Sequence, residues 1–328
     1  MKHSVALAGR VSVSMILAAI LCFVAVVPAQ AGELNEEEAT SLAATVNRVA
    51  PEKISTLSTT ELSSNFLATT DTGSMISVPK DSTSDIEIRP SSVPGTVLTI
   101  ATPETSRASF GKRAADGSIA FAGGNSHQVV QPNEKGLQMS TVLENSNAPI
   151  TFAYTFSSDA ILSLNTDGSI DVTMGHDVTS PDTGEAIAGQ VLVAQIDQPW
   201  ALDANAQPVP TRYVVDGNVV TQIVEHTSAK FAYPIVADPQ LVWEGIIPWF
   251  YFNKLETKDM TSVGGVAAVC GGLALFGPVG IAAAAICGAN IGIIVYKSNY
   301  YKNRNQCVKM HFAPGVIFYG GHTGSRCR

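Results

Sequence analysis

The sequence lacks the short motifs by which the commonest catalytic sites are recognised. It contains no GxSxG nucleophile elbow, no phosphate-binding P-loop, no GxGxxG dinucleotide fingerprint and no HExxH zinc motif. His127 and His226 have no partner at an informative spacing, and no two acidic residues are paired in a way that indicates general acid–base catalysis. We therefore expect a protein that is not an enzyme and that uses no cofactor, no metal ion, no nucleic-acid partner and no recognisable small-molecule substrate.

Cysteine is also scarce, with five residues in 328, and none lies between Cys22 and Cys270. The first 31 residues are typical of a secretory signal peptide: Lys2 and Arg10 precede an apolar run, and Ala29-Gln30-Ala31 is a small-residue cleavage site. We expect cleavage after Ala31 and a secreted, extracellular protein. Cleavage removes Cys22 and leaves an even number of cysteines, which in an exported chain favours disulfides.

The four remaining cysteines lie in the last fifth of the chain: Cys270, Cys287, Cys307 and Cys327. Antiparallel helices joined at Gly277-Pro278-Val279-Gly280 place Cys270 and Cys287 at a similar height, which favours a bridge between them and a second bridge from Cys307 to Cys327. Other pairings stay open. Cys307 and Cys327, with His311 and His322, also resemble a zinc ligand set, but an oxidising compartment favours the disulfides.

Acidic residues are absent beyond Tyr296, where six basic residues occur. From residue 241 onward the net charge is +5, whereas residues 32–240 carry −15. This asymmetry indicates two domains that can attract each other. We expect a signal peptide (1–31), a short helix with a Ser/Thr-rich linker (32–73), an acidic β domain (74–240) and a basic, disulfide-stapled helical-hairpin module (241–328).

Residues 74–238 have the pattern of a β domain, in which short runs rich in Val, Ile, Thr and aromatic residues alternate with turn dipeptides. Three Asp-Gly pairs, at 116–117, 167–168 and 216–217, are typical of tight turns between paired strands. An antiparallel, sandwich-like domain followed by a small α+β module is therefore the expected fold class. We expect residues 34–50 to form a helix, and residues 55–92, rich in Ser and Thr, to be a loose segment or linker.

Near the end of the β pattern, Phe231-Ala-Tyr-Pro-Ile-Val-Ala-Asp-Pro239 follows a hairpin, and a Gly/Ala-rich segment with Cys307 comes after it. This arrangement resembles a family of secreted actinobacterial proteins whose β domain ends in a Tyr-Pro-x-x-Ala-Asp-Pro signature and continues into a cysteine-containing tail. The resemblance covers most of residues 130–328. It implies an architecture and no activity.

Charge is entirely absent from residues 260–296, a run rich in Gly and Ala. It predicts an apolar helical hairpin with one helix at about 257–276 and a second at about 279–296. Small residues recur at i, i+4 spacing, which lets two helix backbones approach closely. The expected packing residues are Ala267 and Gly271 on the first helix and Gly280, Ala284, Gly288 and Gly292 on the second.

Aromatic and basic residues flank the open end of this hairpin, as in an interfacial belt with cationic anchors. The candidate membrane-interface residues are Trp249, Phe250, Tyr251, Tyr296, Lys297, Tyr300, Lys302 and Arg304. One hypothesis is a membrane-active or antibacterial module carried by the acidic β domain, with an anionic membrane surface as its partner. The alternative is an extracellular or cell-envelope binding or structural module in which the hairpin and these aromatic residues form a core.

Overall fold

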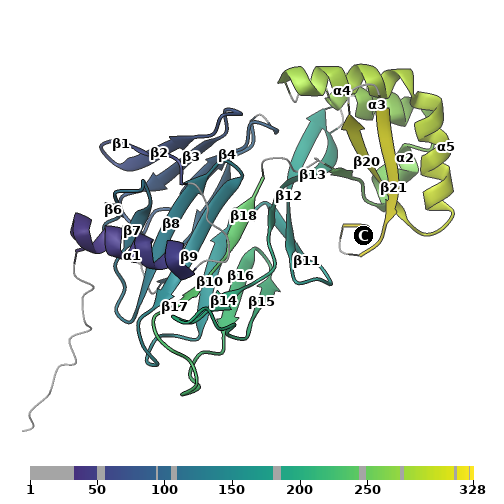
Figure 1. The fold of residues 1–328 in the computed structure, drawn as a ribbon. Coiled ribbons are helices and arrows are strands. Elements are labelled where there is room, and N and C mark those ends of the chain that lie inside the picture. Colours follow the sequence, from purple (N-terminus) through teal and green to yellow (C-terminus); the bar gives the residue numbers. More distant parts are fainter. Residues whose placement is uncertain are drawn as a thin grey trace, which may run out of the picture. The chain divides into compact units, whose positions relative to one another are not determined.

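The structure is a computed structural model, and it describes residues 33–49, 56–93, 95–104, 109–179, 186–243, 249–273, 277–313, 316–324 and 326–328. The expected signal peptide lies outside these residues. Strands dominate the described part of the chain, and helices gather near its C-terminal end (Figure 1). The expected fold class, a mainly antiparallel β domain followed by a small α+β module, is confirmed.

Two antiparallel sheets build the β domain. The first has the strand order β1 (Thr60–Glu61), β2 (Asn65–Thr69), β3 (Met75–Pro79), β4 (Ile86–Arg89), β5 (Leu98–Ala101), β10 (Thr151–Phe156), β16 (Val219–Val224) and β15 (Thr211–Asp216). Inward-facing residues alternate with outward-facing ones, most regularly in β10, because successive side chains of a strand point to opposite faces.

The second sheet extends from the β domain into the C-terminal module. Its order is β6 (Lys112–Arg113), β7 (Ile119–Phe121), β8 (Ser126–Asn133), β9 (Gly136–Leu143), β18 (Gln240–Val242), β13 (Ala186–Ile196), β19 (Trp249–Tyr251), β20 (Cys307–Ala313) and β21 (Val316–His322). Four strands pair beside this path: β11 (Ala160–Leu164), β12 (Ile170–Thr179), β14 (Ala201–Leu202) and β17 (Ile235–Ala237).

Helix α1 (Glu36–Val49) explains why β9 is buried along its whole length and β8 at every position except His127. Asn35 accepts a hydrogen bond from the backbone N–H of Glu38, and the Glu38 carboxylate accepts one from the N–H of Asn35, which forms a capping box at the start of the helix. The buried face of α1 packs on Ala114, Ala120, Val129, Val142 and Val236. The predicted helix over 34–50 is therefore present, and it covers the outer face of the second sheet.

The Ser/Thr-rich segment at 55–92, expected to be loose, forms β1 to β4 instead. The apolar side chains of Phe66, Ile76, Val78 and Ile88 enter the core from alternate positions of these strands, and most of the Ser and Thr residues lie between the strands. Ser and Thr on the solvent side of a strand are compatible with a half-buried sheet. The prediction of a loose segment is wrong. The high Ser and Thr content concealed the alternation of apolar residues that is typical of strands.

The three Asp-Gly pairs lie in turns, as expected. Gly117, Gly168 and Gly217 have φ angles of +91°, +92° and +58°, in the region that favours glycine. In the last hairpin Asp216 pairs with Val219, so Gly217 and Asn218 form a two-residue loop.

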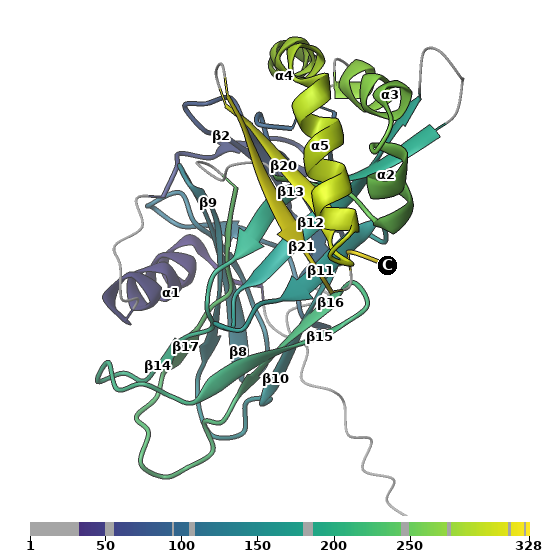
Figure 2. The same ribbon diagram turned by 90° about the vertical axis from the view of Figure 1, so that its right-hand side faces the viewer.

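The C-terminal module shares strands with the β domain. Strand β13 pairs with β12 along one edge and with β18 and then β19 along the other. Helices α2 (Lys254–Asp259), α3 (Val263–Leu273), α4 (Gly277–Ala289) and α5 (Ile291–Lys302) lie beside β20 and β21 (Figures 1 and 2). A single cluster of buried side chains extends from the sandwich into these helices.

The two predicted helices of the hairpin are each broken into two. The first stops at Asp259 and resumes at Val263, where the Thr261 and Ser262 side chains bond back to the carbonyls of Lys258 and Asp259. The second bends at Asn290, so α4 and α5 run in different directions (Figures 1 and 2). Gly277-Pro278-Val279-Gly280, predicted as the turn, is the first turn of α4, where proline is well tolerated.

Candidate functional site

Both expected disulfides are present, and both lie in the C-terminal module. Cys270 of α3 bonds to Cys287 of α4, and Cys307 of β20 bonds to Cys327 near the C-terminus, with Cα–Cα distances of 5.3 and 5.5 Å. Because Cys307 and Cys327 bond to each other, they provide no thiolate for the alternative zinc site. The disulfides fit an extracellular protein.

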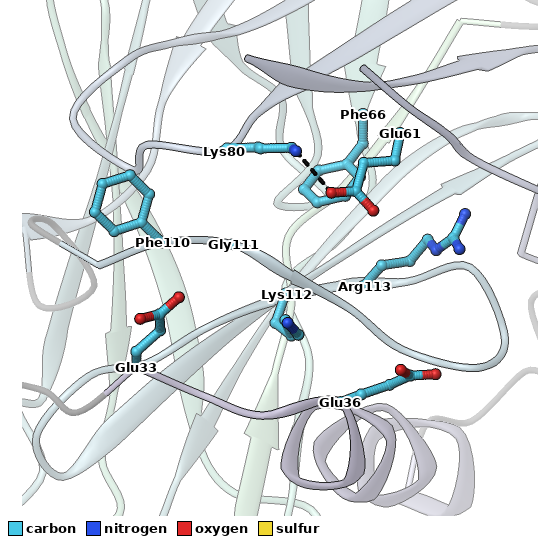
Figure 3. A pocket seen from close by; sticks show the side chains of 9 residues that line it. All are labelled: Glu33, Glu36, Glu61, Phe66, Lys80, Phe110, Gly111, Lys112 and Arg113. Atoms are coloured by element: carbon cyan, nitrogen blue, oxygen red, sulfur yellow. Dashed lines mark hydrogen bonds and ion pairs between the residues drawn. The ribbon is translucent and has the colours of Figure 1, made fainter. Parts of the chain in front are cut away.

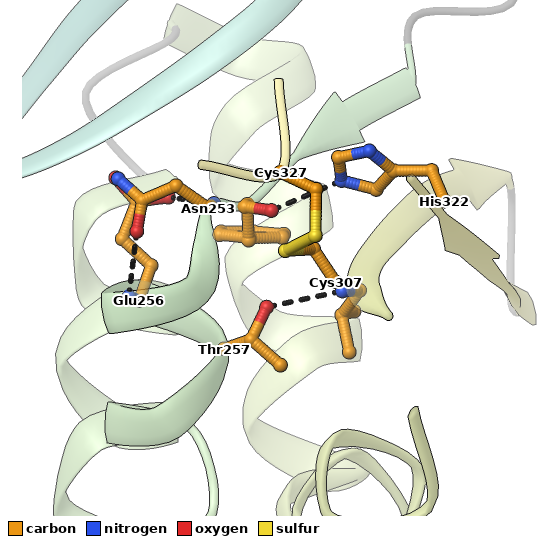
Figure 4. The surroundings of a disulfide bond; sticks show 8 residues. Asn253, Glu256, Thr257, Cys307, His322 and Cys327 are labelled. Carbon is orange, nitrogen blue, oxygen red and sulfur yellow. Dashed lines mark hydrogen bonds between the residues drawn. A yellow bond between two sulfur atoms is a disulfide. The ribbon is translucent and has the colours of Figure 1, made fainter. Parts of the chain in front are cut away.

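The surroundings of Cys307 and Cys327 tie α2 to the sheet (Figure 4). Asn253 and Glu256 form a capping box at the start of α2, and the Thr257 hydroxyl accepts a hydrogen bond from the N–H of Val308 at 3.0 Å. Burial raises the pKa of Glu256 to about 7, although its hydrogen bond with the Asn253 backbone acts in the opposite direction. The His322 imidazole lies 3.0 Å from the carbonyl oxygen of Phe252.

The hairpin of α3 and α4 is part of the core. Its buried residues belong to the same cluster as β20 side chains: Val266, Val269, Cys270, Leu273, Ala283, Cys287, Val308 and Met310. Among the helices of the described residues, none combines the length and apolar character needed to cross a bilayer.

Only some of the small residues that were predicted to pack between the two helices lie in a contact. Gly271, Gly288 and Gly292 are exposed, and a Cβ atom built on Gly288 or Gly292 meets no described atom within 4 Å. The prediction is wrong for these glycines, because the bend at Asn290 and the Cys270–Cys287 bridge turn a different face inward. Ala267 and Ala284 are half-buried, and Gly280 lies where side-chain surroundings are not described.

Residues expected to form one aromatic belt are divided between three places. Phe250 of β19 packs on the helical side of the sheet, with Phe312 at 5.5 Å in an edge-to-face contact. Trp249 and Tyr251 lie on the opposite side of β19, since side chains alternate along a strand. There the Lys309 ammonium lies 4.7 Å from the Trp249 ring and 5.6 Å from the Tyr251 ring.

The remaining members lie on α5, and its outer side forms an exposed surface. Ile294 and Ser298 face the core, whereas Ile293, Tyr296 and Tyr300 are 50%, 65% and 39% exposed. Their spacing places all three on one side of the helix. We call Gly292, Ile293, Tyr296, Lys297, Tyr300 and Arg304 the α5 face. Lys302 is also exposed, at the end of the helix, but at 3.6 residues per turn its position lies on the side opposite the α5 face.

Two cations of the α5 face are held against one aromatic ring. The Arg304 guanidinium lies 3.5 Å from the centroid of the Tyr300 ring, and the Lys297 ammonium lies 6.0 Å from it. Lys254, Lys258 and Lys302 are exposed on α2 and α5, and from residue 249 onward the described acids are Glu256, which is buried, and Asp259. The helical layer therefore presents apolar and aromatic groups within a positive field.

An ion pair fastens the C-terminal residues to the β domain. The Arg326 guanidinium donates to the Asp171 carboxylate of β12 at 3.3 Å and lies 4.4 Å from the Tyr251 ring. Both charged side chains are largely buried. Asp171 also accepts hydrogen bonds from Asn165 and Gln195. No feature of the sequence linked residues 171 and 326, which are far apart along the chain.

A polar pocket of about 260 Å³ lies beside the start of α1 (Figure 3). Lys80 pairs with Glu61 at 2.6 Å, and this hydrogen bond, with the charge of Lys80, lowers the pKa of Glu61. The other lining residues are Glu33, Glu36, Phe66, Phe110, Gly111, Lys112 and Arg113. The acids and bases balance, and no nucleophile beside a base is among them.

Sequence reasoning missed a buried polar network built on Asp238, the acid of the Ala-Asp-Pro segment. Its carboxyl accepts hydrogen bonds from the Trp200 N–H, the Gln222 amide and the Tyr213 hydroxyl. Burial raises the pKa of Asp238 to about 7, although these hydrogen bonds partly oppose the shift. The network links Asp238 to β15 through Tyr213 and to β16 through Gln222, and it thereby stabilises the sandwich. In the sequence, the only hint of this network was the Asp238-Pro239 pair within the Ala-Asp-Pro segment.

Comparison with protein-family models, with curated proteins and with solved structures finds no match to this chain. Function is therefore inferred from the surfaces described above. Of these, the α5 face combines exposed apolar side chains with charge of one sign.

Proposed function

We propose that this is a secreted, non-enzymatic protein that attaches to anionic lipid surfaces through the α5 face, with the helical hairpin as a structural core. The observation that carries the proposal is the exposure of Ile293, Tyr296 and Tyr300 beside Lys297 and Arg304. Tyrosine and basic side chains are favourable together at the boundary between headgroups and acyl chains.

The proposal replaces membrane insertion by surface attachment. Insertion of the hairpin would expose Val266, Leu273 and Cys287, which are now packed on the sheet, and the Cys270–Cys287 bridge restrains their separation. Attachment through α5 needs no such rearrangement, because its outer face is already exposed. This favours the module with the hairpin as core over a released, membrane-active hairpin.

The charge distribution supports one orientation. The acidic residues 32–240 are repelled by an anionic surface, whereas the helical layer is attracted, with about 1 kcal/mol for each basic residue near the surface. A few exposed aromatic side chains add a modest apolar contribution, so the attachment is reversible and weakens as salt screens the charges.

Vesicle co-sedimentation of the mature protein tests the proposal. We expect binding to vesicles rich in phosphatidylglycerol, weaker binding at high salt and little binding to phosphatidylcholine alone. The double variant Lys297→Glu/Arg304→Glu should bind at least about tenfold more weakly. The matched control Arg89→Glu/Arg212→Glu makes the same charge change on exposed strands of the sandwich and should bind like the unaltered protein. Equal loss in both variants, or equal binding to both lipids, would contradict attachment through α5.

A further inference from the structure

The edges of the two sheets differ in how well they are protected. Strands β1, β6 and β14 are two residues long, β15 carries Arg212 and Asp216, and the short β11 lies beside β15. Short strands and charged side chains are the usual means by which proteins prevent edge-to-edge pairing. Strand β21 has neither, since its seven residues, Val316–His322, include no acid, lysine, arginine or proline.

The outer edge of β21 is also open. In the described part of the chain β21 pairs with β20 alone, and its other edge is the end of the second sheet. Ile317 and Tyr319 point to the helices and pack in the core cluster. Phe318 points to the opposite side, is 51% exposed and stacks on His311 at 5.7 Å. Gly320 and Gly321 add no side chain of their own to this edge, and the Lys309 side chain lies over Gly320 while Tyr301 and Gln306 lie over Gly321.

We propose that β21 is a dimerisation edge, at which two copies of this chain pair antiparallel and continue the sheet. A two-fold axis at Tyr319 sets Phe318 of one copy opposite Gly320 of the other, and the reverse. An aromatic ring that covers a cross-strand glycine is a stabilising pair. The strand is thus complementary to itself, as an isologous contact requires, and because it contains no acid, lysine or arginine it brings no such charges together across the axis.

The dimer has a geometric consequence. A two-fold axis between antiparallel strands of one sheet is perpendicular to that sheet, so both helical layers lie on the same side. The two α5 helices would then lie on the same side of the continuous sheet. A dimer would therefore offer two α5 faces for the proposed lipid attachment, but dimerisation itself does not depend on lipid binding.

Sedimentation equilibrium of the mature protein over a range of concentrations tests the dimer. We expect a reversible monomer–dimer equilibrium, and Phe318→Lys should raise its Kd at least about tenfold by placing two ammonium groups near the axis. Val214→Lys changes a strand residue on β15 that is 44% exposed, against 51% for Phe318; it is the matched control and should leave the Kd unchanged. A cooperative unfolding transition of each variant shows that it is folded.

Hydrogen exchange of the β21 amides gives a second readout. Alternate amides of β21 already face β20, so protection of those amides of residues 316–322 that face the open edge should rise with protein concentration in the unaltered protein and stay constant in Phe318→Lys. A protein that is monomeric at all concentrations would overturn the proposal. So would a Phe318→Lys variant that dimerises normally, a loss of dimer in both variants, or full protection in the monomer of the β21 amides that face the open edge.

Discussion

In the sandwich, strands bury large side chains such as Phe121, Phe152 and Tyr154, and no cysteine occurs in this part of the chain. In the C-terminal module, helices rich in Gly and Ala bury little area per residue, and two disulfides and an ion pair hold them in place. Small apolar side chains contribute little hydrophobic free energy each, so covalent and electrostatic links compensate. Because these links hold the module together, the apolar side chains on the outer side of α5 do not have to be buried in its core.

Removal of a disulfide should have the largest effect on this contrast. We expect the double variant Cys307→Ala/Cys327→Ala to lower the free energy of unfolding by about 3 kcal/mol, because the bridge closes a loop of about 20 residues. Cys270→Ala/Cys287→Ala, with a separation of 17, should have a similar effect. Urea unfolding followed by tryptophan fluorescence measures both. A loss below about 0.5 kcal/mol in each would show that the module is stable without its bridges.

The pH dependence of stability compares one buried acid from each region. Asp238 in the sandwich and Glu256 in the module both have a pKa raised to about 7 by burial. A raised pKa means that the folded state binds more protons than the unfolded state between about pH 4 and pH 7, so stability falls as pH rises through this window. For each group we expect a loss of about 2 kcal/mol between pH 5 and pH 7.

Neutral isosteres separate the two contributions. Asp238→Asn and Glu256→Gln should each flatten the fall in unfolding free energy over pH 5–7, and the double variant should flatten it most. Gln retains the capping box of α2, so the Glu256→Gln protein should fold normally. An unchanged slope in both single variants would show that neither buried carboxyl binds an additional proton on folding.

Glycine substitutions give the smallest expected effects and compare packing in the two regions. Gly288→Ala and Gly292→Ala should each stabilise the protein by about 0.5–1 kcal/mol, because both glycines lie within or at the start of helices and face open space. Gly136→Ala in β9 should destabilise it by at least about 1 kcal/mol, since a Cβ there collides with the Leu241 carbonyl. Thermal and urea unfolding measure these changes. If Gly288→Ala destabilised the protein, the result would support the close helix–helix contact predicted from the sequence.

Much of the architecture was predictable because local chemistry determines it. The Asp-Gly turns require positive φ angles, and the equal spacing of Cys270 and Cys287 from the tetrapeptide Gly277–Gly280 favoured their bridge. The bend at Asn290 was not predictable, since no proline marks it and the uncharged run continues across it. Strands β2 to β4 were missed because Ser and Thr dominate the short connections between them, which gave the whole segment the composition of a linker.

The candidate site was only partly predictable for a related reason. Tyr296, Lys297 and Tyr300 were singled out, but the sequence could not separate them from Trp249 and Phe250, whose strand joins the sheet through β13. Which aromatic residues are exposed depends on pairing between strands distant along the chain. The contact between Arg326 and Asp171 and the open edge of β21 depend on the same long-range pairing.

The central claim is that the hairpin is core and that only the outer side of α5 is available for attachment. Hydrogen exchange of the mature protein without lipid tests this claim most directly. We predict that amides of Val266–Leu273 and Ala283–Ala289 are protected to a degree approaching that of β8 and β9, and that they remain so when phosphatidylglycerol vesicles are added. Rapid exchange of these helices in water, or protection that appears only with lipid, would contradict the account.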